Sequence, residues 1–185
     1  VDESFDHATW RTALNYSPTE DMLIYGSIAT GYRTGGFSGR GYNNFTLEPF
    51  EEETVLNYEL GHKTDWQLGE VASMRTNLAI YLQQYDDIQK TVSGSNPDNG
   101  AFETFTTNAA EAEIKGVDFD VLIVPTDSLQ ISFAYAYVDT EYKEWDRAVA
   151  NPKYVTGGTE PLSVVIDYSE SPFTYIAEHS LTSSV

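Results

Sequence analysis

The amino-acid sequence predicts an all-β protein, an antiparallel meander of long strands that forms part of a transmembrane β-barrel. Three short turns alternate with three long segments of loop composition, over residues 34–53, 86–103 and 143–179. The strands between them run to about 10 residues and beyond, whereas strands of soluble sheets cluster near about 5 to 6 residues. Bacterial barrels have short periplasmic turns and long extracellular loops, so this asymmetry also predicts an orientation. The short turns cover residues 17–21, 65–70 and 125–128.

The first three predicted strands cover residues 8–17, 22–33 and 54–64. In the first, Leu14 and Tyr16 lie on one face and polar or small residues on the other, which is the period of two expected of a strand. The second is interrupted by glycines and has no clearly polar face, so its facing stays open. The third alternates again, with apolar positions Leu56, Tyr58 and Leu60 and polar positions Asn57, Glu59 and Lys63.

Three further strands are predicted over residues 71–85, 104–124 and 129–142, and a seventh begins near Ser180. Their apolar positions form uncharged stripes, which include Leu78, Ile80, Leu82, Val117, Phe119, Val121, Phe133 and Tyr135. Alternation alone fits a lipid-facing band and the inner face of a soluble sandwich equally well. The strand length favours the barrel, because a tilted strand needs about 9 to 11 residues to cross a bilayer.

Composition excludes several classes of protein. The chain has 185 residues, of which 41% are hydrophobic, and this is enough for one folded domain over residues 1–185. The formal net charge of −19 would repel phosphates and argues against nucleic-acid binding. No apolar run approaches the about 18 residues of a membrane helix. Without cysteine, the chain has neither disulfides nor a thiolate site.

No arrangement of residues in the sequence is typical of a catalytic or metal site. His7, His62 and His179 are scattered along the chain with no cysteine partners, which gives no support to a metal centre or a nucleophilic triad. The glycine-rich run 31–36 is not followed by the Gly-Lys-[Ser/Thr] of a phosphate-binding loop. We therefore expect no enzyme activity, no metal and no cofactor.

Three segments of the chain, in the same order, resemble sequences characteristic of TonB-dependent outer-membrane receptors. Residues 23–37 end in the aromatic-Arg-x-Gly-Gly-Phe run of that family, written YRTGGF here. Residues 53–66 are similar to its E-T-x-x-N-Y-E-x-G-x-K strand, and residues 108–118 to its N-A-x-x-x-x-x-K-G-V-[DE] strand. The resemblance extends from about Trp10 to Tyr142.

The resemblance implies a bacterial outer-membrane location and the import of a scarce nutrient, such as an iron–siderophore complex. It also implies a 22-stranded barrel, an N-terminal plug and a short box that engages an inner-membrane energy-coupling complex. Neither plug nor box is evident, so we expect residues 1–185 to be an incomplete barrel of about six strands and the start of a seventh. The implied partners are outer-membrane lipid, a small-molecule nutrient or metal chelate, and the coupling complex through a plug absent from this chain.

The residues of these motifs have structural interpretations of their own. Gly35 and Gly36 permit positive φ where a strand passes into a loop, and Gly61 and Gly116 are expected to leave room on the lumen face or to relieve curvature. Asn57, Glu59 and Lys63 share one face, so we expect their polar groups to pair within a polar barrel interior.

If this chain contributes to a ligand-binding site, we expect the residues to be loop and upper-lumen positions. Arginine pairs with carboxylates of a chelator, and aromatic rings stack on flat ligand groups. An alternative role for the same residues is to order the loops. The candidates are Tyr32, Arg33, Arg40, Tyr42 and Trp145.

Two other functions remain open at this point. One is a soluble or secreted β-sheet module that binds carbohydrate, with the tyrosines as a stacking platform. The other is a complete small barrel that anchors the envelope, which predicts an even number of strands instead of the six and a truncated seventh counted here.

Overall fold

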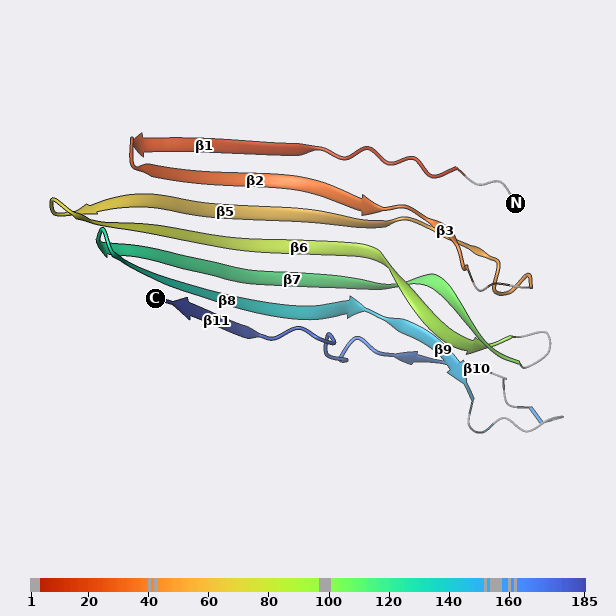
Figure 1. Ribbon diagram of the computed structural model, residues 1–185. Coiled ribbons are helices and arrows are strands. Elements are labelled where there is room, and N and C mark those ends of the chain that lie inside the picture. Colours follow the sequence, from red (N-terminus) through yellow and green to blue (C-terminus); the bar gives the residue numbers. More distant parts are fainter. Residues whose placement is uncertain are drawn as a thin grey trace.

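The protein is a single antiparallel main sheet with two small satellite sheets at one end (Figure 1). The computed structural model describes residues 4–39, 41, 43–96, 101–151, 153, 158–159, 161 and 163–185, without the side chains of residues 95, 147–150 and 163. No helix in these residues is long and apolar enough to cross a membrane.

Seven strands form the main sheet in the order β1-β2-β5-β6-β7-β8-β11, and every neighbouring pair is antiparallel. The two edge strands, β1 and β11, are not paired with each other, so the sheet is open. The strands are β1 (Arg11–Thr19), β2 (Met22–Arg33), β5 (Glu53–Leu68), β6 (Ala72–Ser95), β7 (Phe102–Thr126), β8 (Leu129–Glu144) and β11 (His179–Ser184).

Two short hairpins lie within the predicted long loops. Strand β3 (Gly36–Phe37) pairs with β4 (Pro49–Phe50), and β9 (Asp146–Ala150) pairs with β10 (Ser163–Asp167). Both lie at the end of the sheet opposite the three tight turns (Figure 1). The predicted separation of short turns and long loops is therefore confirmed.

The turns are tighter than the sequence predicted. Strand β5 continues to Leu68, and the turn that follows it contains Gly69 at φ 100, a conformation that suits glycine. Asp65 and Arg75 extend the ladder towards this turn through an ion pair of 2.6 Å. The polar residues that indicated a long turn are therefore cross-strand partners.

The predicted loop over residues 86–103 is wrong, because β6 runs on to Ser95 and β7 begins at Phe102. The register shifts between Tyr85 and Ile88, where Asp87 bulges out at φ 56. Beyond the bulge the ladder resumes from Gln89 opposite Asn108. We call this continuation the β6–β7 arm; it consists of β6 from Ile88 onwards and β7 up to Ala110. The ribbon of β6 crosses that of β7 at the start of the arm (Figure 1).

One face of the main sheet is largely apolar. Residues directly opposite one another in a ladder share a face, and the row that includes Gly26 continues through Leu60, Ile80 and Val117. This register settles the facing of β2, whose Ile24 and Ile28 belong to the apolar face. Leu60 is 52% exposed and Ile80 46% exposed, so nothing in the described residues covers this face.

The opposite face is polar, and its polar groups pair across neighbouring strands. The Tyr25 hydroxyl donates to the Glu59 carboxylate at 2.7 Å, and the Lys63 ammonium lies 5.7 Å from the centre of the Tyr25 ring. No ion pair joins Glu59 to Lys63 among the described residues. Four residues along a strand span about 13 Å, which is too far for a direct ion pair. Glu59 and Lys63 therefore find partners on the polar face through Tyr25 and not through each other.

Gly61 and Gly116 leave room on the polar face, as predicted. A methyl group on Gly61 would collide with the Tyr25 ring, which belongs to the residue directly opposite. A methyl group on Gly116 would lie 2.5 Å from the Tyr81 hydroxyl, again on the residue directly opposite. Each glycine therefore accommodates a cross-strand tyrosine.

Charged residues mark the upper limit of the apolar face on β7 and β8. Lys115 pairs with Asp139 at 3.1 Å, and Lys143 with Glu141 at 2.6 Å. The hydrogen bond to Glu141 raises the pKa of Lys143 above its ordinary value. The apolar stripe thus ends in a belt of ion pairs on the side of the long loops.

Candidate functional site

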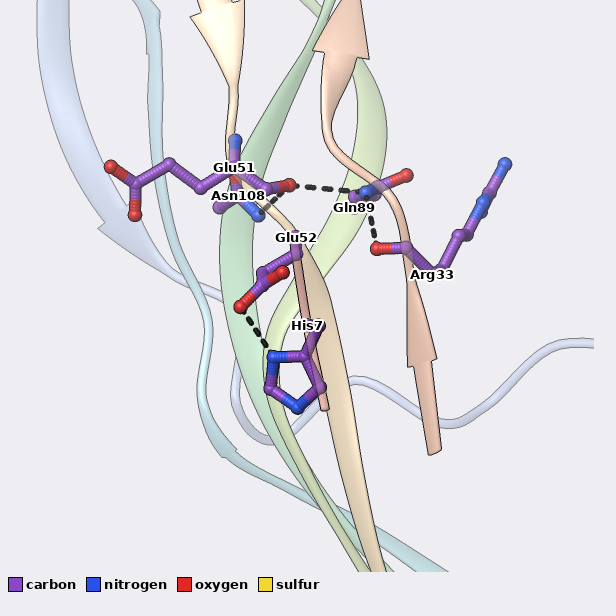
Figure 2. A network of polar contacts seen from close by, with 6 residues as sticks. All are labelled: His7, Arg33, Glu51, Glu52, Gln89 and Asn108. Carbon is purple, nitrogen blue, oxygen red and sulfur yellow. Dashed lines mark hydrogen bonds and ion pairs between the residues drawn. The ribbon is translucent and has the colours of Figure 1, made fainter. Parts of the chain in front are cut away.

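Two carboxamide side chains hold the base of the 34–53 loop against the β6–β7 arm (Figure 2). Gln89 Nε2 donates to the carbonyl oxygens of Thr34 at 2.9 Å and Glu51 at 3.1 Å, which lie near opposite ends of the loop. Asn108 exchanges two hydrogen bonds with the Glu51 backbone, at 2.7 and 3.0 Å, and donates to the Asp87 carbonyl at 2.8 Å. These contacts lie where the bulge interrupts the β6–β7 ladder, so side-chain amides replace the backbone hydrogen bonds that are missing there.

Gln89→Glu is expected to loosen the base of the loop, because a carboxylate cannot donate to the two carbonyl groups and instead faces them. These two hydrogen bonds are exposed, and a hydrogen bond of this kind contributes about 0.5 to 1.5 kcal/mol, which corresponds to about 2-fold to 10-fold faster exchange of amide hydrogens in residues 34–52. Hydrogen exchange read by mass spectrometry measures this. Gln83→Glu, lower on the same strand, is the matched control. Unchanged exchange in Gln89→Glu would show that the amide does not hold the loop.

The N-terminal segment crosses the base of the same loop. His7 Nδ1 lies 2.6 Å from the Glu52 carboxylate, and its ring stacks on Tyr32 with 5.1 Å between centroids (Figure 2 shows the His7–Glu52 contact). Gly35 approaches the Phe5 ring and a neighbouring backbone carbonyl so closely that a side chain would collide with both. Neither Gly35 nor Gly36 uses the positive φ that glycine permits, and Gly35 instead provides space for the loop base.

An aromatic cluster lies on the polar face at the long-loop end. Tyr142, at the end of β8, is only 6% exposed and stacks on Phe173 with 4.1 Å between ring centroids. Trp145 packs against Tyr142 at 4.6 Å and against Tyr168 at 5.5 Å. The cluster joins β8 to the segment between β10 and β11, which lies more than 20 residues further along the chain.

Lys90 of the β6–β7 arm reaches into this aromatic cluster. Its ammonium donates to the Tyr142 hydroxyl at 2.7 Å and lies 4.7 Å from the Tyr142 ring centre, 5.1 Å from that of Trp145 and 5.8 Å from that of Phe173. A cation within about 6 Å of an aromatic face is attracted by the ring quadrupole. Trp145 Nε1 is buried and has no hydrogen-bond acceptor in the described part of the chain. We call the group of Lys90, Tyr142, Trp145 and Phe173 the Lys90 cage.

The comparison with protein families agrees with this architecture. The family described as TonB dependent receptor-like, beta-barrel, matches residues 1–182. The chain belongs to this TonB-dependent receptor family. No solved structure matches the chain significantly.

Membership of the TonB-dependent receptor family places the protein in the bacterial outer membrane, as a transporter for nutrient uptake and not an enzyme. The apolar face of the sheet therefore meets lipid and the polar face lines the lumen. Long loops are extracellular in such barrels, so the β6–β7 arm and the Lys90 cage lie at the extracellular end. The soluble carbohydrate-binding module, proposed from sequence as the alternative, is excluded by this location.

The receptor's sequence-predicted ligand residues do not form one group. Tyr32 lies on the lipid-facing side of β2 and stacks on His7. Arg33 follows it on the lumen side; its carbonyl oxygen accepts from Gln89 at 3.5 Å, while its side chain points away from the carboxamide contacts (Figure 2). Trp145 lies across the sheet beyond β5, β6 and β7. With neighbouring strands about 4.8 Å apart, β2 and β8 are separated by about 19 Å. Arg40 and Tyr42 lie outside the described residues.

Trp145 acquires partners that the sequence did not indicate. Lys90 fell within a predicted loop, and Tyr142 was interpreted as the end of a strand. The only sequence signal was the pair of aromatic residues Tyr142 and Trp145, at and just after the end of the predicted strand 129–142. The contribution of Phe173 depends on how the extracellular segment folds back, which periodicity cannot reveal.

Proposed function

We propose that this receptor imports an iron–siderophore complex or a similarly scarce nutrient, and that the seven-stranded sheet contributes part of the barrel wall and of the extracellular binding surface. The observation that carries the proposal is the Lys90 cage on the lumen side of the extracellular end. Rings and a cation at this position can contact a solute before it enters the lumen. The open edges of β1 and β11 support pairing with further strands, because unpaired edges are not tolerated in lipid.

Import by this family depends on an energy source at the inner membrane, and we propose that the same coupling drives this receptor. We expect the solute to bind first at the extracellular loops and to pass inward when the coupling complex acts. The chemistry is non-covalent binding throughout. Of the ligand candidates Tyr32, Arg33, Arg40, Tyr42 and Trp145, the uptake experiment tests Trp145.

Deleting the gene is expected to abolish energy-dependent uptake of one nutrient from a panel of ⁵⁵Fe-loaded siderophores, labelled cobalamin and labelled oligosaccharides. Trp145→Ala is expected to lower that uptake about 10-fold, because stacking and cation–π contacts are each worth about 0.5 to 2 kcal/mol. Trp66→Ala, near the periplasmic turn, is the control for losing a tryptophan. Uptake of every nutrient at the wild-type rate in the deletion strain would contradict the proposal.

A further inference from the structure

We propose that a hollow on the lipid-facing side of the sheet, centred on Gly26, binds one acyl chain of an outer-leaflet lipid as a retained, slowly exchanging ligand. This inference goes beyond the proposed function, because it concerns the outside of the barrel and is independent of the nutrient that is imported. The hollow has a volume of about 540 Å³. It extends over β1, β2, β5 and β6, which lie side by side in the sheet (Figure 1).

Two adjacent rows of the ladder supply the lipid-facing side chains of the hollow. In one row Gly26 lies between Leu14 on β1 and Leu60 on β5. Leu14 is 76% exposed and Leu60 is 52% exposed, so a position without a side chain lies between two leucines that project from the sheet. The other lipid-facing residues of the lining are uncharged; they are Thr12, Ile28, Tyr58, Ile80 and Leu82.

The space beside Gly26 is not filled by any described residue. A methyl group at this position would have the Glu59 carbonyl oxygen at 3.8 Å and Leu60 Cδ1 at 3.9 Å as its nearest neighbours, and both are ordinary contacts. At Gly61 and Gly116, in contrast, the ring of a cross-strand tyrosine takes the space. A glycine weakens the interior of a strand and often marks a place where a ligand approaches closely. Gly26 therefore needs a partner from outside the described chain.

The surroundings of the hollow follow from the family to which the chain belongs. The apolar face meets lipid, and further barrel strands would pair beside β1 and β11 without covering that face. On β6 the hollow is lined by Ile80 and Leu82, and Leu82 lies opposite Lys115 of the ion-pair belt on the side of the long loops. This part of the hollow is therefore in the extracellular half of the bilayer, where the acyl chains of outer-leaflet lipids are the neighbours.

An acyl chain in the hollow makes contacts that it does not make against a flat apolar surface. Leu14 and Leu60 flank it, and the backbone at Gly26 lies beneath it. An empty hollow would lose these dispersion contacts outright, and such contacts drive association where both surroundings are hydrocarbon. Because the lipid-facing lining carries no charge, the hollow selects the hydrocarbon part of a lipid and not its headgroup.

A second copy of the receptor is the alternative occupant that the shape admits. Around a twofold axis, Leu60 of each copy would enter the hollow beside Gly26 of the other, because the projecting side chain and the hollow are neighbours on one surface. In that case the receptor would be a dimer and would retain no lipid at this place. The two occupants are therefore separated by measuring bound lipid and oligomeric state together.

The test measures lipid exchange on the full receptor chain by native mass spectrometry. The receptor is assembled in nanodiscs of dimyristoyl phosphatidylcholine and transferred into the chain-deuterated form of the same lipid, and the undeuterated lipid that remains bound is counted over time. We expect Gly26→Leu, which fills the hollow, to speed the exchange of one slowly exchanging lipid per receptor at least about 10-fold. A factor of this size requires only about ten close atom contacts.

Val121→Leu is the matched control, because it adds bulk to the same face outside the hollow and should leave the retained lipid in place. Leu14→Ala lowers one wall without adding bulk and should also speed the exchange, so it decides if Gly26→Leu fails to assemble. Equal retention in the parent, Gly26→Leu and Leu14→Ala would overturn the inference, as would loss of the same lipid in Val121→Leu. A lipid-free dimer that Gly26→Leu separates into monomers would overturn it in favour of the second copy.

Discussion

Leu78→Arg is expected to destabilise the protein in its membrane by about 2 to 4 kcal/mol and to reduce the amount that assembles. Leu78 lies midway along β6 between Leu82, which is opposite Lys115 at the upper limit of the apolar face, and Met74 near the periplasmic turn. A charged side chain on the lipid face costs about this amount at the middle of the bilayer and little near its surfaces. Urea unfolding in lipid vesicles measures the free energy, and heat-modifiable mobility in gels measures assembly.

Asn77→Arg is the matched control for Leu78→Arg, because the two positions are adjacent and face opposite sides. Asn77 donates to the Asp120 carboxylate at 2.6 Å on the lumen side, where an arginine can keep a partner. We expect a change of less than about 1 kcal/mol. If both variants were equally harmful, or if Leu78→Arg were harmless, the assignment of the apolar face to lipid would be wrong.

The sequence predicted the strand order, the turns and the two faces of most strands, because alternation is a local property that directly reflects burial. The sequence could not decide which side of β2 faces lipid, because Gly26 interrupts the apolar stripe and Tyr25, on the other side, is itself largely apolar. Only the register, with Gly26 opposite Leu60 and Tyr25 opposite Gly61, resolves that strand. Facing in such a segment is therefore a property of the ladder, not of the strand alone.

The extracellular end was predicted less well for a related reason. Asp86 and Asp87 break the alternation and resemble a loop, yet Asp87 is a single bulged residue between two paired stretches. Gln89 and Asn108 replace the lost backbone bonds there. A bulge and a loop have the same local composition, and contacts between distant residues decide between them.

The candidate site shows the same limit. Trp145 was identified from its residue type and its place after a long strand, which is as far as local reasoning extends. The other cage residues Lys90 and Phe173 lie 55 and 28 positions from Trp145 along the chain, and they come together only through the arm and the returning extracellular segment. Sequence reasoning therefore identified one residue of the cage and not the cage.

Gly116→Ala is expected to destabilise the protein more than Gly61→Ala, although both replace a lumen-facing glycine opposite a tyrosine. The added methyl group at Gly116 would lie 2.5 Å from the backbone oxygen of Tyr137, which the ladder holds in place, as well as near Tyr81. At Gly61 the three nearest atoms all belong to the outer end of the Tyr25 side chain, which can rotate away. Overpacking costs about 1 to 3 kcal/mol, so we expect the upper part of that range for Gly116→Ala and the lower part for Gly61→Ala.

Adding a tyrosine-to-alanine change to each glycine variant shows whether the new methyl group collides with a side chain or with the backbone. Tyr25→Ala should remove most of the cost of Gly61→Ala, because it deletes the ring to which the three atoms nearest the methyl belong. Tyr81→Ala should leave most of the cost of Gly116→Ala, because the Tyr137 carbonyl remains. Urea unfolding in vesicles of the single and double variants gives the two coupling energies needed, one for each glycine–tyrosine pair. Full rescue of Gly116→Ala by Tyr81→Ala would mean that the backbone of β8 yields, and that the glycine of this family motif is needed for the tyrosine alone.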